Sequence, residues 1–310
     1  MGSIMNSFYT YDFINQYNAA RNPSEVHCHN TGLVNMYQRY LFEKLISVFK
    51  FTGLREDIPL NSLQGVLLGW GHIVFINTDA FGVIPQAATL GGYNVFYQPS
   101  YAIVTNPSLK PNSRRLIIGV DCEIVKMQPD YGGALDLVTT YADMMGLALE
   151  SAGINLVNSK LAYVFAAGSL AQAQSFKKLY DEIMSGAPAA FMDKTLFNED
   201  GTRNWDFFVN NLKQNYIGSE ILEDMKRIED KFETDIGIPN ANTYKRERMI
   251  SSEVGSNNIA TGAKAILWAE TMNEGFDRVN DMFGTNLHVE YRYADAVKTP
   301  GIESEGVLNG

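Results

Sequence analysis

The residues with the clearest potential for chemistry are three basic side chains in one long segment without regular periodicity. Lys245, Arg246 and Arg248 lie within residues 236–258, which are rich in Asn, Ser and charge. Irregular segments of this length are uncommon inside compact domains and are usually functional or disordered. A run of charges most often marks a solvated surface, and that interpretation stays open. The alternative is a mobile basic loop that contacts a polyanion.

No catalytic motif accompanies this basic segment. The sequence has no GxxxxGK[ST], HExxH, GxSxG or CxxC pattern. Without a phosphate-binding loop, any ATP hydrolysis that the function needs would belong to a separate protein. The histidines His27, His29, His72 and His288 fall in three separate segments. His27 and His29 flank Cys28, but adjacent residues rarely complete a metal site, and no second ligand pair is present. We therefore expect no enzyme activity, no catalytic residue, no cofactor and no bound metal.

The composition indicates a globular protein with a sizeable core. The chain has 310 residues, of which 45% are hydrophobic and 19% are charged. Its net charge of −10 argues against a generic nucleic-acid binder, which usually has a basic surface. Cys28 and Cys122 are far apart and are expected to be reduced thiols. No secretory signal is visible, and the longest apolar stretch, residues 63–76, is too short to cross a bilayer. We expect a protein that is soluble and intracellular when made.

The segment that leads into the basic run is predicted to be an acidic helix over residues 219–235. Ser219 is a plausible N-cap, and Gly237 and Pro239 stop the pattern. Apolar side chains recur at helical spacing on one face. The helix carries seven acidic and three basic side chains, a net charge of −4. The acidic helix and the basic run therefore have opposite charge.

Further helices and strands follow from hydrophobic periodicity. Asn61 is expected to cap a short helix, and Met36 and Tyr40 are expected on the apolar side of the first helix. The predicted helices cover residues 32–51, 61–69, 134–152, 170–184 and 259–283. The predicted strands cover residues 72–76, 93–97, 101–105, 115–125, 161–166, 189–192 and 287–293.

One stretch of sequence carries a specific family resemblance. Residues 237–258 read GIPNANTYKRERMISSEVGSNN, and a helical pattern followed by GTNLHVEYRY comes next. This order resembles the portal proteins of phi29-like podophages, also called upper collar or head–tail connector proteins. In that family a stem helix ends in Asn-Ala-Asn and is followed by a basic loop, an acidic-Val-x-Ser-Asn run, a wing helix and a strand. The match extends more loosely to Tyr293, and weaker similarity reaches back to Tyr37.

The resemblance implies an α+β portal fold with long stem helices, a small β-rich wing and a strand–helix–strand clip. Placed on this sequence, the parts are an N-terminal arm (1–30), a wing (31–133), a stem helix (134–154), a clip (155–210), a second stem helix (211–235), a channel or tunnel loop (236–258), a wing helix and strand (259–298) and a flexible tail (299–310).

The resemblance also implies a function and partners. Such a protein forms a ring, in that family a dodecamer, at one capsid vertex. The ring conducts double-stranded DNA during packaging and ejection and joins the capsid protein, the packaging ATPase and the lower collar or tail protein. This implies a location in the virion, and in the host cytoplasm during assembly. RNA binding is not implied, because Arg21 is the only basic residue among the first 30 and the family's basic N-terminus is absent.

Site residues follow from the same resemblance. Lys245 and Arg246 match the basic pair of the family's channel loop and would touch backbone phosphates without reading sequence. Arg248 also matches. The channel-facing side of the second stem helix would hold Glu220, Asp224, Arg227 and Lys231. A lysine of the family is replaced by Glu220, so a basic ring at that level is not expected.

Two alternatives remain at the level of sequence. The first is a soluble α+β enzyme or nucleotide-binding protein in which residues 245–248 form a mobile lid over an anionic substrate. It predicts a small oligomer and a pocket lined by titratable residues. The second is a different structural component of the tail.

Overall fold

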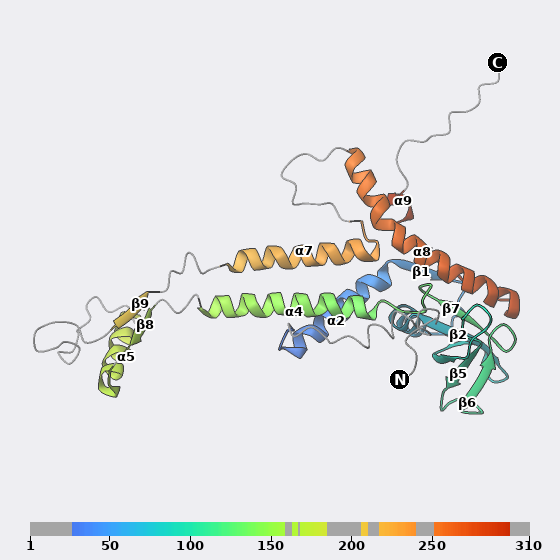
Figure 1. The fold of residues 1–310 in the computed structure, drawn as a ribbon, viewed down its shortest axis with the longest axis horizontal. Helices are drawn as coiled ribbons and strands as arrows, with labels where there is room; N and C mark the ends of the chain where they lie inside the picture. Colours follow the sequence, from blue (N-terminus) through green and yellow to red (C-terminus); the bar gives the residue numbers. More distant parts are fainter. Residues whose placement is uncertain are drawn as a thin grey trace, which may run out of the picture. The chain divides into compact units, whose positions relative to one another are not determined.

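The computed structural model describes residues 27–158, 163–166, 168–184, 206–209, 217–239 and 251–297. The chain divides into two compact units, Met1–Leu147 with Lys226–Gly310, and Ala148–Met225. The helices and strands of both units, shown in Figure 1, confirm the α+β class. The helices are α2 (Thr31–Ser47), α3 (Leu60–Gln64), the π-helix η2 (Gly65–Trp70), α4 (Leu135–Asn158), α5 (Leu170–Met184), α7 (Gly218–Ile236), α8 (Ser251–Phe283) and α9 (Ala294–Val297).

The β-rich core of the first unit consists of two antiparallel sheets. Their strand orders are β3-β2-β7 and β4-β5-β6. Side chains from both sheets share one buried cluster, which includes Val74, Ile76, Val104 and Ile124. The strands are β2 (His72–Thr78), β3 (Gly82–Gln86), β4 (Ala88–Gly91), β5 (Tyr101–Thr105), β6 (Ser113–Ile117) and β7 (Cys122–Lys126). The strand predictions for residues 72–76 and 101–105 are confirmed.

The strand predicted over residues 93–97 is wrong, because this segment forms a turn. The Asn94 side chain accepts hydrogen bonds from the backbone N–H groups of Phe96, at 2.8 Å, and Gln98, at 3.0 Å. Such a side chain–backbone bond competes with strand pairing. Tyr97 has a φ of 59°, outside the strand region. Residues 115–125 likewise form two strands, β6 and β7, on either side of a turn.

The first helix ends earlier than the predicted residue 51. Asn30 caps α2 by accepting hydrogen bonds from the N–H groups of Gly32 and Leu33. After Ser47 the chain forms strand β1 (Phe49–Thr52), which pairs antiparallel with β10 (His288–Tyr291). That partner lies some 240 residues away, so local periodicity could not reveal it.

Two smaller helix predictions also need correction. Met36 and Tyr40 are exposed rather than on the buried side of α2, which is formed by Tyr37, Leu41 and Leu45. Asn61 is not a cap, because α3 begins at Leu60 after Pro59 and continues as η2. Leu63, Leu67 and Leu68 of the apolar run are buried, and no side chain caps the helix.

Helix α8 covers the β core of the first unit. Trp268 and Phe276 are almost fully buried, and Phe276 contacts Phe75 edge-to-face at 6.1 Å. Asn273 and Asn280 hydrogen-bond the backbone around β10, which holds that strand beside the helix. The alternation predicted for residues 287–293 is confirmed by buried Val289 and exposed His288. The predicted helix over residues 259–283 is also confirmed, but α8 begins at Ser251.

The second unit contains α5 and the two-stranded sheet of β8 (Tyr163–Ala166) and β9 (Asp206–Val209). The helix predicted over residues 170–184 has the bounds of α5. Strand β8 pairs with β9, whereas the strand predicted over residues 189–192 lies outside the described residues. Within this unit the N–H of Ile217 donates to the side chain of Asn155 at 3.2 Å, so the start of α7 contacts the end of α4.

Candidate functional site

The acidic helix is present as α7, with bounds one residue wider at each end than predicted. Ser219 therefore lies inside the first turn rather than at the N-cap. Of the predicted channel-facing residues, Glu220 and Asp224 lie in the second unit, and Arg227 and Lys231 lie in the first. All four side chains are exposed, and their spacing puts them along one side of the helix. This exposure is compatible with a channel-facing role, which stays a prediction.

A partly buried charge cluster joins α2 to the end of α7 nearest the basic segment. Lys44 donates to Glu229 and, at 2.5 Å, to Glu233, while the Tyr40 hydroxyl donates to Glu229 at 2.5 Å. The side chains of Lys44, Glu229 and Glu233 are only 20%, 25% and 19% exposed. Burial alone would lower the pKa of Lys44, but the hydrogen bonds to Glu229 and Glu233 outweigh it and raise that pKa. The cluster is therefore charged at neutral pH.

The same end of α7 is also fastened to α4. The Tyr141 hydroxyl donates to Asp235 at 2.6 Å, and its ring meets Phe232 edge-to-face at 5.4 Å. Lys231 donates to the other oxygen of Asp235 at 2.8 Å, so this predicted channel residue is partly engaged within its own helix. Phe232 is fully buried. Burial and the hydrogen bond to Asp235 raise the pKa of Tyr141, which keeps it a donor.

The chain leaves α7 through a tightly packed turn. Gly237 has a φ of 92°, which a side chain would strain. A Cβ atom at this position would also lie 2.5 Å from the Cβ of Ala265 on α8. The Gly237 carbonyl accepts a hydrogen bond from the Tyr291 hydroxyl of β10, and Ile236 is fully buried. Helices α7 and α8 and strand β10 thus fix the point at which the basic segment begins.

The predicted loop over residues 236–258 is too long. Ile236 ends α7, and residues 251–258 belong to α8. The part between these helices contains Lys245, Arg246 and Arg248, all of which lie outside the described residues. The prediction for these three side chains therefore stays a prediction.

Sequence reasoning missed the residues that anchor this segment. Lys44, Tyr40 and Tyr291 gave no motif, because their partners lie about 54 to 189 residues away in sequence. Charge was the one sequence feature that could have indicated the contact between Lys44 and α7. Lys44 is the only basic residue in the second half of α2, and α7 carries a surplus of carboxylates.

The His27-Cys28-His29 cluster has a structural role. His27 Nδ1 lies 3.1 Å from Asp143, and the Cys28 N–H donates to the same carboxylate at 3.0 Å. Cys28 and Cys122 are buried and form no disulfide, in agreement with the expected thiols. Within the described part of the chain, no group of three His, Cys, Asp or Glu residues could hold a metal ion. The described helices also include none long and apolar enough to cross a membrane.

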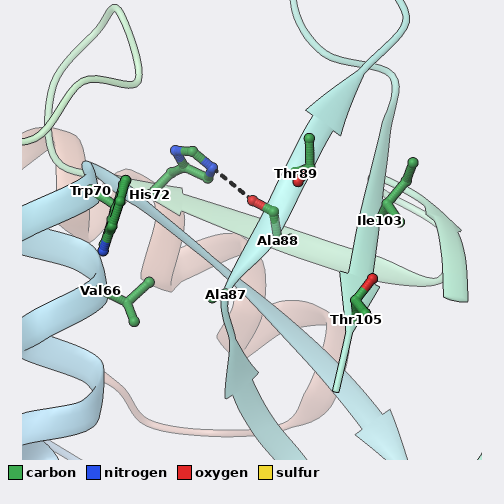
Figure 2. Close-up of a pocket in the computed structure, with 8 residues that line it drawn as sticks. All are labelled: Val66, Trp70, His72, Ala87, Ala88, Thr89, Ile103 and Thr105. Atoms are coloured by element: carbon green, nitrogen blue, oxygen red, sulfur yellow. Dashed lines mark hydrogen bonds between the residues drawn. The ribbon is translucent and has the colours of Figure 1, made fainter. Parts of the chain in front are cut away.

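One pocket of about 330 Å³ lies between η2 and strands β4 and β5. Figure 2 shows Trp70 and Val66 on one side and Thr89 and Ile103 on the other. Nε2 of His72 lies 3.1 Å from the Ala88 carbonyl oxygen. The other ring nitrogen of His72 faces the Tyr131 carbonyl at 3.2 Å. His72 is the only titratable residue of the lining, and each of its ring nitrogens faces a backbone carbonyl.

Comparison with known proteins identifies the family. The family model described as Phage Connector (GP10) matches residues 10–295 of this chain. The chain belongs to the Phage Connector family. The match spans the acidic helix, the basic segment and α8, and it confirms the resemblance seen in residues 237–258. The protein is therefore a bacteriophage head–tail connector, a structural component of the virion at the portal vertex.

A similar solved structure is the portal and tail of native bacteriophage P68. Its chain is 15% identical to this connector, with 83% of this chain and 86% of that chain covered and a TM-score of 0.40. A likeness of this size carries no argument about this chain. The alternative of a soluble enzyme with a basic lid finds no support in the family match.

Proposed function

We propose that this connector assembles as a ring of identical subunits, a dodecamer, whose central channel conducts double-stranded DNA during packaging and ejection. Identical subunits that meet through two different patches close into a ring when the rotation allows it. In this proposal the ring sits in the capsid protein shell, receives DNA from a separate packaging ATPase and later binds the lower collar or tail protein. Assembly takes place in the host cytoplasm.

The parts of the chain take the roles that the family resemblance implies. Helices α4 and α7 form the stem, the β8–β9 sheet with α5 forms the clip, and the β-rich core with α8 forms the wing. The exposed side of α7 with Glu220, Asp224, Arg227 and Lys231 faces the channel. These four side chains carry no net charge, but α7 as a whole has seven acidic and three basic side chains. This acidic surplus repels DNA phosphates, so the duplex slides rather than binds, since each phosphate contact adds affinity.

The single observation that carries the channel-loop proposal is the fastened end of α7. Lys44 and Tyr141 hold this end to α2 and α4, and Tyr291 fixes the carbonyl of Gly237 just before the basic segment. A firm anchor is what a loop needs if it is to resist a force along the DNA. We therefore assign Lys245, Arg246 and Arg248 to contacts with backbone phosphates that restrain the packaged DNA from slipping back.

The test is a double variant, Lys245→Ala with Arg246→Ala, examined in two assays. Electron-microscope class averages of the purified connector should show closed rings with a central hole for wild type and variant alike. Packaging should proceed in the variant, but the particles should lose DNA. This loss should grow with salt in the wild type and depend less on salt in the variant.

A matched control removes the same charge elsewhere. Arg39 and Arg292 are exposed residues of the first unit, and Arg39→Ala with Arg292→Ala lowers the net charge equally. This control should retain DNA as the wild type does. Normal retention by the loop variant would disprove the role of the loop, and monomers or dimers at high concentration would disprove the ring itself.

A further inference from the structure

A pocket of about 480 Å³ opens on the first unit between the β4–β5 turn, the end of β6, strand β7 and helix α8. Two cations, Lys126 and Arg278, contribute to its lining, together with Glu123 and Glu274. Polar side chains of the turn after β4, Asn94 and Gln98, complete one edge. The residues that line this pocket lie apart from α7 and the basic segment in sequence.

The two cations of this pocket are in different situations. Arg278 is fully engaged: its Nε donates to buried Glu123 at 3.3 Å, and its other nitrogens donate to the carbonyls of Glu274 and Ile124. Lys126 is half-buried, and its Nζ lies over the ring of Tyr131, 4.8 Å from the centroid. Among the described residues, no carboxylate lies within the 4.0 Å of an ion pair from this nitrogen.

The electrostatics of Lys126 reflect this lack of a direct partner. Burial, and after it the positive charge of Arg278, lowers the pKa of Lys126, although Glu274 and Asp130 oppose the shift from a distance. A half-buried ammonium without a direct counter-ion costs free energy that an incoming carboxylate would recover. The pocket floor therefore favours an acidic side chain supplied from outside the chain.

The surface around the pocket is apolar and exposed. Val95 and Phe96, on the turn that supplies Asn94 and Gln98, are 84% and 76% exposed. Ile117 on the pocket lining and Val120 on the neighbouring turn are also exposed. No charged residue occurs between Asp79 and Lys110. Exposed aromatic side chains with few charges around a pocket are typical of a protein–protein interface.

We propose that this surface, defined by Lys126, Phe96 and the 480 Å³ pocket, is a subunit interface that receives an acidic side chain of the adjacent copy of this connector. The proposal rests on the ring of the proposed function. Charge favours a second copy as the occupant, because the chain has 35 acidic and 25 basic residues and so offers many carboxylates. A ring contact joins two different patches, so the acid comes from another face of the neighbouring copy.

Zero-length carbodiimide cross-linking of isotopically mixed rings tests this interface directly. Equal amounts of ¹⁴N- and ¹⁵N-labelled connector are mixed as dissociated subunits and reassembled, and cross-linked peptides are read by mass spectrometry. Peptides that join Lys126 to a carboxylate should contain both isotopes in about half of the cases, as expected for random neighbours in a ring.

Lys50 provides the internal control, because it already pairs with Glu290 of its own chain at 3.3 Å. The Lys50–Glu290 cross-link should carry a single isotope in every case. Closed rings in which Lys126 cross-links stay within one isotope, or do not form, would overturn the interface while leaving the ring intact. Failure to obtain any ring would overturn the proposed function, and the interface with it.

Assembly of variants supplies the second measurement. Lys126→Met keeps the apolar stem and removes the charge, and it should raise the subunit concentration needed for half-assembly about tenfold. Lys50→Met should leave that concentration unchanged. Tryptophan fluorescence should show both variants folded, since Lys126 makes no ion pair with any of the described residues. Equal assembly of the two folded variants would contradict the proposal.

Discussion

Replacing Lys44 by Ala should destabilise the connector far more than replacing Lys50 by Ala, although each change removes one lysine from an ion pair. Lys44 lies between Glu229 and Glu233, with the three side chains only 19–25% exposed. Lys50 lies 3.3 Å from Glu290, and both side chains are about half exposed, 53% and 52%. Because the two sites differ in burial, a larger destabilisation by Lys44→Ala would be attributed to the burial of its ion pairs.

The expected magnitudes follow from the geometry. Loss of Lys44 leaves two carboxylates facing each other without a cation, and such a loss costs about 2 kcal/mol for a partly buried cluster. Loss of Lys50 should cost about 0.5 kcal/mol or less, because exposed pairs are weak and screened by salt. A difference of this size is readily measured.

The assay is urea unfolding of each variant at one protein concentration. Emission of Trp268, which is buried in the first unit, reports the unfolding of that unit. The slope with denaturant should be the same for all variants, so that midpoint shifts report stability. Equal shifts for the two variants would refute the claim that the Lys44 cluster fastens α7.

The pH dependence gives the Lys44 prediction a second check. Burial would raise the pKa of Glu229, but its hydrogen bonds with Lys44 and Tyr40 outweigh burial and hold that pKa below the ordinary 4.5. A lowered pKa stabilises the fold above pH 4.5, and this contribution is lost as pH falls through the folded value. The raised pKa of Lys44 matters at alkaline pH. Its contribution to the stability of the fold is present below pH 10.5 and is lost as pH rises through the pKa of Lys44 in the folded protein. The difference between wild type and Lys44→Ala should therefore be full at neutral pH and shrink in acid.

Two further predictions concern the start of the basic segment. Gly237→Ala should cost about 2–3 kcal/mol in urea unfolding, because it combines backbone strain with a clash against Ala265. Gly284→Ala is the matched control, because Gly284 has a similarly positive φ of 69° but an added Cβ atom would meet nothing within 4 Å. This variant should cost only about 1 kcal/mol. Equal costs for the two variants would contradict the tight packing at Gly237. Tyr291→Phe should reduce the loss of stability at alkaline pH, because burial raises the pKa of Tyr291 to about 12, so that its contribution is present below pH 10.0 and lost as pH rises toward the folded value. An unchanged alkaline unfolding profile for this variant would show that Tyr291 does not contribute.

Most long helices could be predicted because their signals are local. Helix α5 and most of α7 follow directly from periodicity and stop signals, and Gly284 ends α8 as expected. The predictions were wrong where the backbone conformation depends on a strand partner far away in the sequence or on a side chain–backbone hydrogen bond. Residues 49–52 form a strand because β10 is there to pair, and residues 93–97 form a turn because Asn94 binds the backbone.

Some features of the candidate site could likewise be predicted from the sequence, and others could not. The family motif in residues 237–258 and the charge of α7 could be taken from the sequence, and the family match confirmed the resemblance that the motif indicates. The anchor residues could not be found, because nothing local to Tyr40, Lys44 or Tyr291 points to α7 or to Gly237.

The amino-acid sequence alone therefore determined the family, the acidic helix and the position of the basic segment in the chain. These depend on residue types and on spacings of a few residues, which secondary structure and motifs preserve. Only the tertiary structure decided that Lys44 lies between Glu229 and Glu233 and that Tyr291 holds the Gly237 carbonyl. It also decided that Lys126 forms no ion pair with a carboxylate of the described residues. Such pairings depend on which distant segments pack together and how far each charge is removed from water.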